Sequence, residues 1–359
     1  MWPDRRLLDL LGIELPIIQA PMAGATGSAM AVAVCEAGGL GSLPCAMLDA
    51  AKARAEIGVI RQRTPKPINV NFFCHTPTQP DPQCEQAWRA RLKPFYLELG
   101  LDPEASAPAF NRAPFDDAMC SIVEDLKPEV VSFHFGLPEP ALLGRVKSAG
   151  CRVISSATTA EEARWLEERG CDAVIAQGYE AGGHRGMFLT SDIATQAGTF
   201  ALLPQIVDAV KVPVVAAGGI ADGRGIAAAF ALGASAMQVG TAYLFTPEAT
   251  ITDLHRAALR AARDNQTALT NLFSGRPARG LVNRVMREMG PMSELAPAFP
   301  TASGALAPLK AKAEAAGRTD FTALWSGQAA RLAREMGAAD LTCALAEDAL
   351  RRLKAMAAP

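Results

Sequence analysis

The chain has 359 residues, of which 50% are hydrophobic, so it is long enough for one large core or for two domains. Its 35 basic and 37 acidic residues nearly balance and form no long basic run, so we do not expect nucleic acid as a partner. The eight cysteines include no CxxC pair, which argues against zinc and iron–sulfur sites and favours buried thiols in a reducing compartment.

The N-terminal segment and the hydropathy pattern predict a cytoplasmic protein. Asp9 and Glu14 interrupt the apolar residues near the N-terminus, so this segment lacks the apolar region of a signal peptide. No apolar run reaches the roughly 18 residues of a membrane-spanning helix. We expect a monomer or a homodimer that acts on small molecules and does not contact membranes.

Short apolar runs alternate with helix patterns over most of the chain. Ser28 can cap the first helix of this series, Thr159 and Glu162 have the spacing of a capping box, and Asp222 can cap a later helix. The expected strands are 17–20, 40–43, 68–73, 130–135, 152–156, 173–176, 212–216 and 236–239. The helices expected with them include 29–37, 51–61, 85–99, 117–126, 202–210 and 225–232.

This alternation predicts an α/β fold. Near-continuous apolar strands are typical of a parallel sheet that is covered on both faces. Eight such units favour a (β/α)8 TIM barrel. The alternative is an open doubly wound sheet, but the first strand is not followed by the GxGxxG pattern of its dinucleotide-binding version.

Two segments depart from the alternation. The proline-rich segment of about 74–114 is expected to be an insertion after the third strand, with a functional or capping role. Beyond residue 246 the strand pattern fades, and helices are expected at 250–270, 283–289, 321–337 and 339–356. We therefore predict a barrel over 1–245 and a mainly helical cap over 246–359, whose last helices pack back on the barrel.

Polar residues and glycines gather where the expected strands end, which is where barrel enzymes build their sites. The stretch AQGYEAGGHRG, residues 176–186, combines Gln177 and His184 with Gly182 and Gly183. Such a loop suits a backbone that approaches a flat or anionic ligand closely while an imidazole is held over it. Neighbouring glycines would give a core imidazole little packing, so a functional role for His184 is favoured.

The loops after the last two strands are candidates for a phosphate site. Gly218 and Gly219 follow the seventh strand, and Gly240 with Thr241 follows the eighth. Asn71 and Gln177 carry amides that suit the polar edge of a flavin ring, and a phosphate beside a flat heterocycle points to FMN. Strands one and eight also deliver Ala20, Pro21, Met22, Gln238 and Val239 to this end of the barrel.

Several candidates also have a purely structural interpretation. His134, flanked by two phenylalanines, can equally be a core histidine, and Asn71 can bond the backbone inside the barrel. Arg185 can bind a phosphate or tie down its own loop. His255 follows a helix pattern with charged neighbours and is expected to be solvated. The other side chains expected to have no role at the site are His75 and Cys74.

Eight stretches taken together resemble the nitronate monooxygenases, formerly called 2-nitropropane dioxygenases, and within them the class I branch. The resemblance runs from the first strand almost to the C-terminus. The stretches are QAPMAG (19–24), VNFF (70–73), SFHFGLP (132–138), AQGYEAGGHRG (176–186), AAGGI (216–220), QVGTAYL (238–244), SGRPARG (274–280) and LWSGQ (324–328).

The resemblance implies an FMN-dependent (β/α)8 barrel that oxidises alkyl nitronates, notably propionate 3-nitronate, with O2 to a carbonyl compound and nitrite. It implies that His184 is the base that takes the α-proton of a neutral nitroalkane. It places Met22 near the isoalloxazine and His134 on the substrate side. The FMN contacts that it implies are Asn71, Gln177, Gly182, Gly219 and the residues from Gln238 to Thr241.

Two other functions share parts of this pattern. FMN-type enoyl-acyl carrier protein reductases and NAD(P)H:quinone reductases have the same barrel and an EAGGH-like loop. A barrel that binds a phosphate metabolite without any flavin is a third, non-redox possibility.

Overall fold

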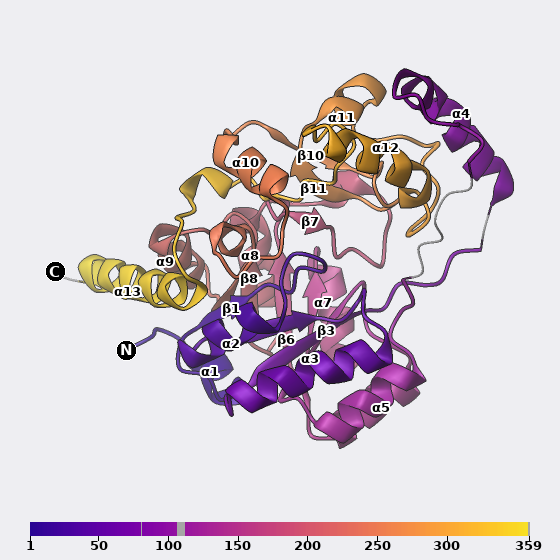
Figure 1. The fold of residues 1–359 in the computed structure, drawn as a ribbon. Helices are drawn as coiled ribbons and strands as arrows, with labels where there is room; N and C mark the ends of the chain where they lie inside the picture. The colour runs from indigo at the N-terminus through magenta and orange to yellow at the C-terminus, as the bar shows by residue number, and fades with distance from the viewer. Residues whose placement is uncertain (80, 106–111, 358–359) are drawn as a thin grey trace.

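The computed structural model describes residues 1–79, 81–105 and 112–357. Eight parallel strands form one sheet in the order β1-β9-β8-β6-β5-β4-β3-β2, and a parallel bridge between Ile18 and Leu40 joins its two ends (Figure 1). The fold is therefore the predicted (β/α)8 barrel. The strands are β1 (Ile17–Gln19), β2 (Gly41–Pro44), β3 (Ile68–Phe73), β4 (Val130–His134), β5 (Arg152–Ala157), β6 (Ala173–Gln177), β8 (Val214–Ala217) and β9 (Ala236–Val239).

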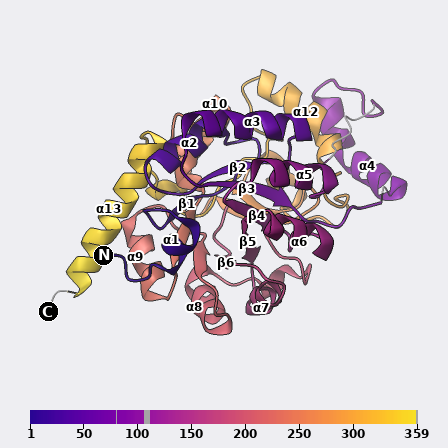
Figure 2. The same cartoon turned by 90° about the horizontal axis from the view of Figure 1, so that it is seen from below.

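Helices surround the barrel, which explains why its strands are apolar on both faces. Figure 2 shows them as a ring outside the sheet. Every residue of β6 is buried, and so is every residue of β8. The helices of this ring are α2 (Ser28–Glu36), α3 (Ala50–Arg63), α5 (Asp117–Leu126), α6 (Pro140–Ser148), α7 (Ala160–Glu168), α8 (Thr199–Ala209) and α9 (Gly223–Ala231), with α1 (Arg6–Leu11) beneath.

The predicted helix starts are correct in part. Asp222 accepts hydrogen bonds from two backbone N–H groups of α9, as expected. The Thr159 hydroxyl accepts from the N–H of Glu162, but the Glu162 carboxylate bonds the N–H of Thr158, at 2.7 Å, instead of closing the capping box. The Ser28 prediction is wrong, because Ser28 is already the first residue of α2 and a glycine precedes it.

The chain beyond residue 246 covers the barrel mouth (Figure 1). It contains α10 (Asp253–Ala261), β10 (Thr267–Thr270), β11 (Ala278–Leu281), α11 (Arg284–Met289), α12 (Ser303–Ala315) and α13 (Ala338–Ala357). β11 lies between β10 and the two-residue β7 (Gly183–His184) in a second, antiparallel sheet.

One helix predicted in this region is too long, and another is wrong. The helix expected over 250–270 ends at Ala261, because residues 267–270 pair with β11. The helix expected over 321–337 is an irregular segment in which Trp325 bridges Gly280 and only Ala330–Leu332 forms a short 3-10 turn. In both places pairing with a segment distant in sequence overrides a local helix pattern.

The segment of about 74–114 adds a helix to the cap. Asp81 caps α4 (Pro82–Glu98), and Trp88, Leu92 and Tyr96 on this helix are buried against the region of α12. The Trp88 indole donates to the carbonyl of Ala302 at 3.2 Å. The segment thus belongs to the same apolar cluster as the cap, although residues 80 and 106–111 lie outside the described part.

α13 returns to the barrel, where it packs against α9 and α2 (Figure 2). The domain boundary at residue 245 stays a prediction. None of the helices in the described ranges combines the length and the hydropathy needed to cross a membrane.

Candidate active site

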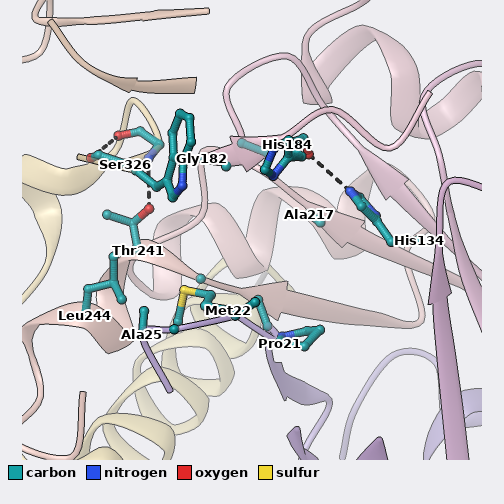
Figure 3. Close-up of a pocket in the computed structure, with 18 of the residues that line it drawn as sticks. Pro21, Met22, Ala25, His134, Gly182, His184, Ala217, Thr241, Leu244 and Ser326 are labelled. Carbon is teal, nitrogen blue, oxygen red and sulfur yellow. Dashed lines mark hydrogen bonds between the residues drawn. The ribbon is translucent and has the colours of Figure 1, made fainter. Parts of the chain in front are cut away.

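A cavity of about 460 Å³ lies at the carboxyl ends of the barrel strands, under the cap (Figure 3). This volume is in the range of sites for cofactors and small substrates. Met22 and Pro21 form one side of it, and His184 and His134 lie opposite. The sequence-predicted residues on its wall are Ala20, Pro21, Met22, Asn71, His134, Gln177, Gly182, Gly183, His184, Gly218, Gly219, Gln238, Gly240 and Thr241.

Val239 is the predicted residue that the structure does not place on this wall. Its side chain is fully buried in the hydrophobic core, and its carbonyl accepts from the N–H of Ala20 at 2.8 Å. Successive strand residues point to opposite faces, so when Gln238 faces the cavity Val239 faces the surrounding helices.

Gln177 holds the loop that carries His184 through two hydrogen bonds. The Gln177 amide donates to the carbonyl of His184 at 2.9 Å and accepts from the N–H of Gly186 at 2.7 Å. His184 pairs with Ala278 of β11, so the cap also positions the loop. Gln177 therefore braces the loop as well as lining the cavity.

Arg185 ties the same loop to the barrel. Its side chain is completely buried and is absent from the cavity wall. The guanidinium donates to the carbonyls of Gly178 at 2.6 Å and Gln177 at 2.7 Å, and to the Gln196 side chain at 2.9 Å. The structure therefore supports the interpretation in which Arg185 ties down its own loop, rather than the one in which it binds a phosphate.

The glycines of the loop serve packing as well as ligand access. A Cβ on Gly182 would lie 2.5 Å from the backbone nitrogen of Gly327, so glycine lets residues 326–327 cross the loop. Gly183 has a φ of 72°, which favours glycine. The Gly327 N–H in turn donates to the Thr241 hydroxyl at 2.8 Å.

Aromatic side chains surround His184, and one of its ring nitrogens forms a hydrogen bond. Its Nε2 lies 2.8 Å from the Ser274 hydroxyl, and its ring centroid lies 5.4 Å from that of Phe299 and 5.5 Å from that of Trp325. The Ser274 hydroxyl donates to the carbonyl of Arg276 at 3.2 Å. A hydroxyl has one hydrogen, so we assign the imidazole proton to Nε2 and the lone pair to Nδ1.

The environment keeps His184 neutral. Burial first, and then the positive charge of Arg112, lower the pKa of His184 well below its usual value. The nearby imidazole of His134 and the guanidinium of Arg276 act in the same direction. A neutral imidazole with an unprotonated nitrogen can accept a proton from a ligand in the cavity.

His134 lines the cavity with both ring nitrogens engaged. Its Nδ1 lies 3.0 Å from the Ser156 hydroxyl, and its Nε2 lies 3.2 Å from the carbonyl of His184. Burial, followed by the charge of Arg276, lowers the pKa of His134 to about 3. These bonds hold the His184 backbone, while a substrate contact by His134 stays a prediction.

The expectation that His255 is solvated is wrong. His255 is buried, lines the cavity, and places its Nε2 3.2 Å from the carbonyl of Trp325. It shares the buried face of α10 with Leu259 four residues later, and this spacing was the signal in the sequence. His75 is also buried but does not line the cavity. Cys74 does not line it either, and burial raises the pKa of its thiol well above the usual value.

The opposite side of the cavity offers an unpaired polar atom and a glycine-lined wall. The Gln238 Oε1 is buried with no hydrogen-bond partner in the described residues. Gly218 and Gly219 adopt φ values of 110° and 73°, which bring backbone without side chains to the wall. A ligand with donor groups, a flat ring and a phosphate fits this wall, and FMN has these features.

A family model described as nitronate monooxygenase matches residues 4–348. A nitronate monooxygenase of Paraburkholderia phytofirmans is 45% identical over 344 residues, which cover 95% of this chain and 94% of that protein. One of Pseudomonas aeruginosa is 45% identical over 345 residues, which cover 96% of this chain and 98% of that protein.

Two solved structures are similar to this chain over nearly its whole length. A nitroalkane oxidase from Streptomyces ansochromogenes is 41% identical with a TM-score of 0.88, over 98% of this chain and 100% of that one. FabK from Thermotoga maritima is 29% identical with a TM-score of 0.75, over 99% of both chains.

Proposed function

The chain belongs to the nitronate monooxygenase family, and we propose that it is an FMN-dependent enzyme that oxidises alkyl nitronates with O2 to a carbonyl compound and nitrite. The observation that carries this proposal is the neutral, enclosed His184 facing Met22 across a glycine-lined cavity. A propionate 3-nitronate or a similar short nitronate would occupy the His184 side.

The residues of the strand ends would hold the cofactor. Bound FMN supplies the redox chemistry that couples oxidation of the substrate to O2. Asn71 and Gln238 would present their amides to the ring, and backbone N–H groups after β8 and β9 would hold the phosphate. The proposed set is Ala20, Pro21, Met22, Asn71, Gln177, Gly182, Gly183, Gly218, Gly219, Gln238, Val239, Gly240 and Thr241, with Val239 contributing only through its backbone.

His184 would act when the substrate arrives as a neutral nitroalkane. Its Nδ1 takes the α-proton, and the electron pair of the broken C–H bond stays on the substrate and delocalises into the nitro group, which gives the nitronate. The anion then forms beside an imidazolium and near Arg112 and Arg276, so the cationic surroundings favour it. Phe299 and Trp325 limit the access of water to the imidazole.

Ser274 should matter only for this proton transfer. We expect Ser274→Ala to lower kcat/KM for a freshly dissolved neutral nitroalkane by about tenfold, because one neutral hydrogen bond fixes the reactive tautomer. The kcat/KM for a preformed nitronate should change by less than about twofold, because no proton is taken from it. Steady-state O2 consumption with both substrates measures the difference.

Ser274→Thr is the matched control, since it keeps the hydroxyl and should keep most of the nitroalkane activity. Equal losses on the nitroalkane and the nitronate in Ser274→Ala would show that Ser274 supports the fold of the site rather than the proton transfer.

The EAGGH stretch, residues 180–184, which is also typical of FMN-type enoyl-acyl carrier protein reductases and NAD(P)H:quinone reductases, keeps a reductase as the second candidate function. A test of flavin binding distinguishes the monooxygenase and the reductase from a barrel without redox chemistry. Protein purified with or incubated with FMN should retain an absorbance near ~450 nm after gel filtration. A protein that stays colourless would contradict both the monooxygenase and the reductase.

A further inference from the structure

Arg112 is a cation on the cavity wall, and no carboxylate of the described residues neutralises it. It lies at the end of the segment 74–114, outside the motifs shared with the family, and is half-buried. Its guanidinium carbon is 5.8 Å from the centroid of the Phe299 ring, and that ring packs edge-on against His184. Within the described ranges no Asp or Glu forms an ion pair with Arg112, and burial alone lowers its pKa.

The other cations near the cavity already have partners. Lys310, also on the wall, lies 3.9 Å from the carboxylate of Glu314. Arg276 donates to the carbonyl of Met187, stacks over Phe135 at 3.9 Å, and is not part of the wall. Among the described residues of the wall, Arg112 is therefore the Lys or Arg side chain that is left for a ligand.

An unneutralised, partly buried guanidinium costs free energy that a bound anion recovers. Arg112 and His184 pack against the same Phe299 ring, at 5.8 Å and 5.4 Å from its centroid, and the charge of Arg112 lowers the pKa of the His184 imidazole. The nitronate end of the substrate is assigned to His184. A second anionic group farther along the same molecule would meet Arg112 on the same cavity wall.

We propose that Arg112 binds a carboxylate on the carbon chain of the substrate and so makes the enzyme selective for nitronates that carry one. This inference rests on the proposed function and adds a specificity-determining residue to it. The guanidinium presents a planar pair of donors that matches a carboxylate, and Arg112 and His184 on the same wall would bind the two anionic ends of the substrate. A plain alkyl nitronate leaves Arg112 without a partner.

The test compares two nitronates of equal chain length, propionate 3-nitronate and propyl 1-nitronate. In Arg112→Met we expect kcat/KM to fall about 30-fold or more for the carboxylated substrate and less than about threefold for the other. Arg112→Lys should recover part of the loss. Lys310→Met removes a wall cation that already has an acidic partner, and it should leave the ratio of the two kcat/KM values unchanged.

A binding measurement separates this inference from the proposed function. Calorimetry without O2 should show that the FMN-loaded wild type binds 3-nitropropionate at least about tenfold more tightly than 1-nitropropane, and that Arg112→Met removes the difference. Equal binding of both ligands, or an unchanged preference in Arg112→Met, would overturn the role of Arg112. A wild type that shows the binding preference but oxidises neither nitronate would overturn only the proposed activity.

Discussion

His184→Asn should remove most of the activity on neutral nitroalkanes and spare much of the activity on preformed nitronates. We expect kcat/KM for the nitroalkane to fall by about 10²- to 10⁴-fold, the usual contribution of a general base, and that for the nitronate by less than about tenfold. The Asn amide extends only as far as the imidazole Nδ1 and loses the bond to Ser274, but Gln177 and the pairing with Ala278 still hold the loop, so its fold should persist. Parallel kinetics with the two substrates measure the effect.

Equal losses on the two substrates would contradict the base role of His184. A thermal unfolding curve of His184→Asn that matches the wild type excludes general damage to the structure.

The pH profile should agree with this role. Burial and neighbouring positive charges lower the pKa of His184 well below its usual value, so the basic form dominates at neutral pH and is lost only as the pH falls through the lowered pKa. We expect kcat/KM for freshly dissolved neutral nitroalkane to be level around neutrality and to decline only in acid. A rise centred near pH ~6.5 would indicate an unperturbed imidazole instead.

Arg185→Met should have the largest effect on stability. Its removal leaves the carbonyls of Gln177 and Gly178 and the side chain of Gln196 without their charged donor inside the protein. We expect the free energy of unfolding in urea to fall by about 3 kcal/mol, because hydrogen bonds from a charged donor are lost where water does not replace them.

The same change should loosen the His184 loop, so activity on nitroalkane and nitronate should fall together, unlike in His184→Asn. Arg164→Met on the exposed face of α7 is the control and should change the free energy of unfolding by less than about 0.5 kcal/mol. Wild-type stability of Arg185→Met would show that the loop does not depend on this guanidinium.

The barrel could be predicted because its signals are local. The strands are continuous apolar runs, and caps such as Asp222 mark where helices begin. The small sheet at the barrel mouth could not be predicted, because β7 has only two residues and its partner, Ala278, follows more than 90 residues later. In neither segment do apolar and polar residues alternate over enough positions to identify a strand.

Most of the candidate site followed from the same geometry, since the carboxyl ends of parallel strands meet at one end of a barrel. The sequence did not predict which side chains the cap and the insertion bring to the cavity. Ser274, Arg112 and Trp325 come from segments without barrel periodicity, and only the folded chain shows that each lies near His184 or on the cavity wall.

O2 consumption by the FMN-loaded protein with propionate 3-nitronate, measured together with nitrite release and without NAD(P)H, tests the proposed function most directly. We expect O2 uptake and nitrite release that both depend on the nitronate. The contradicting result is neither O2 uptake nor nitrite release with the nitronate, while the same protein oxidises NAD(P)H with a quinone or an enoyl substrate.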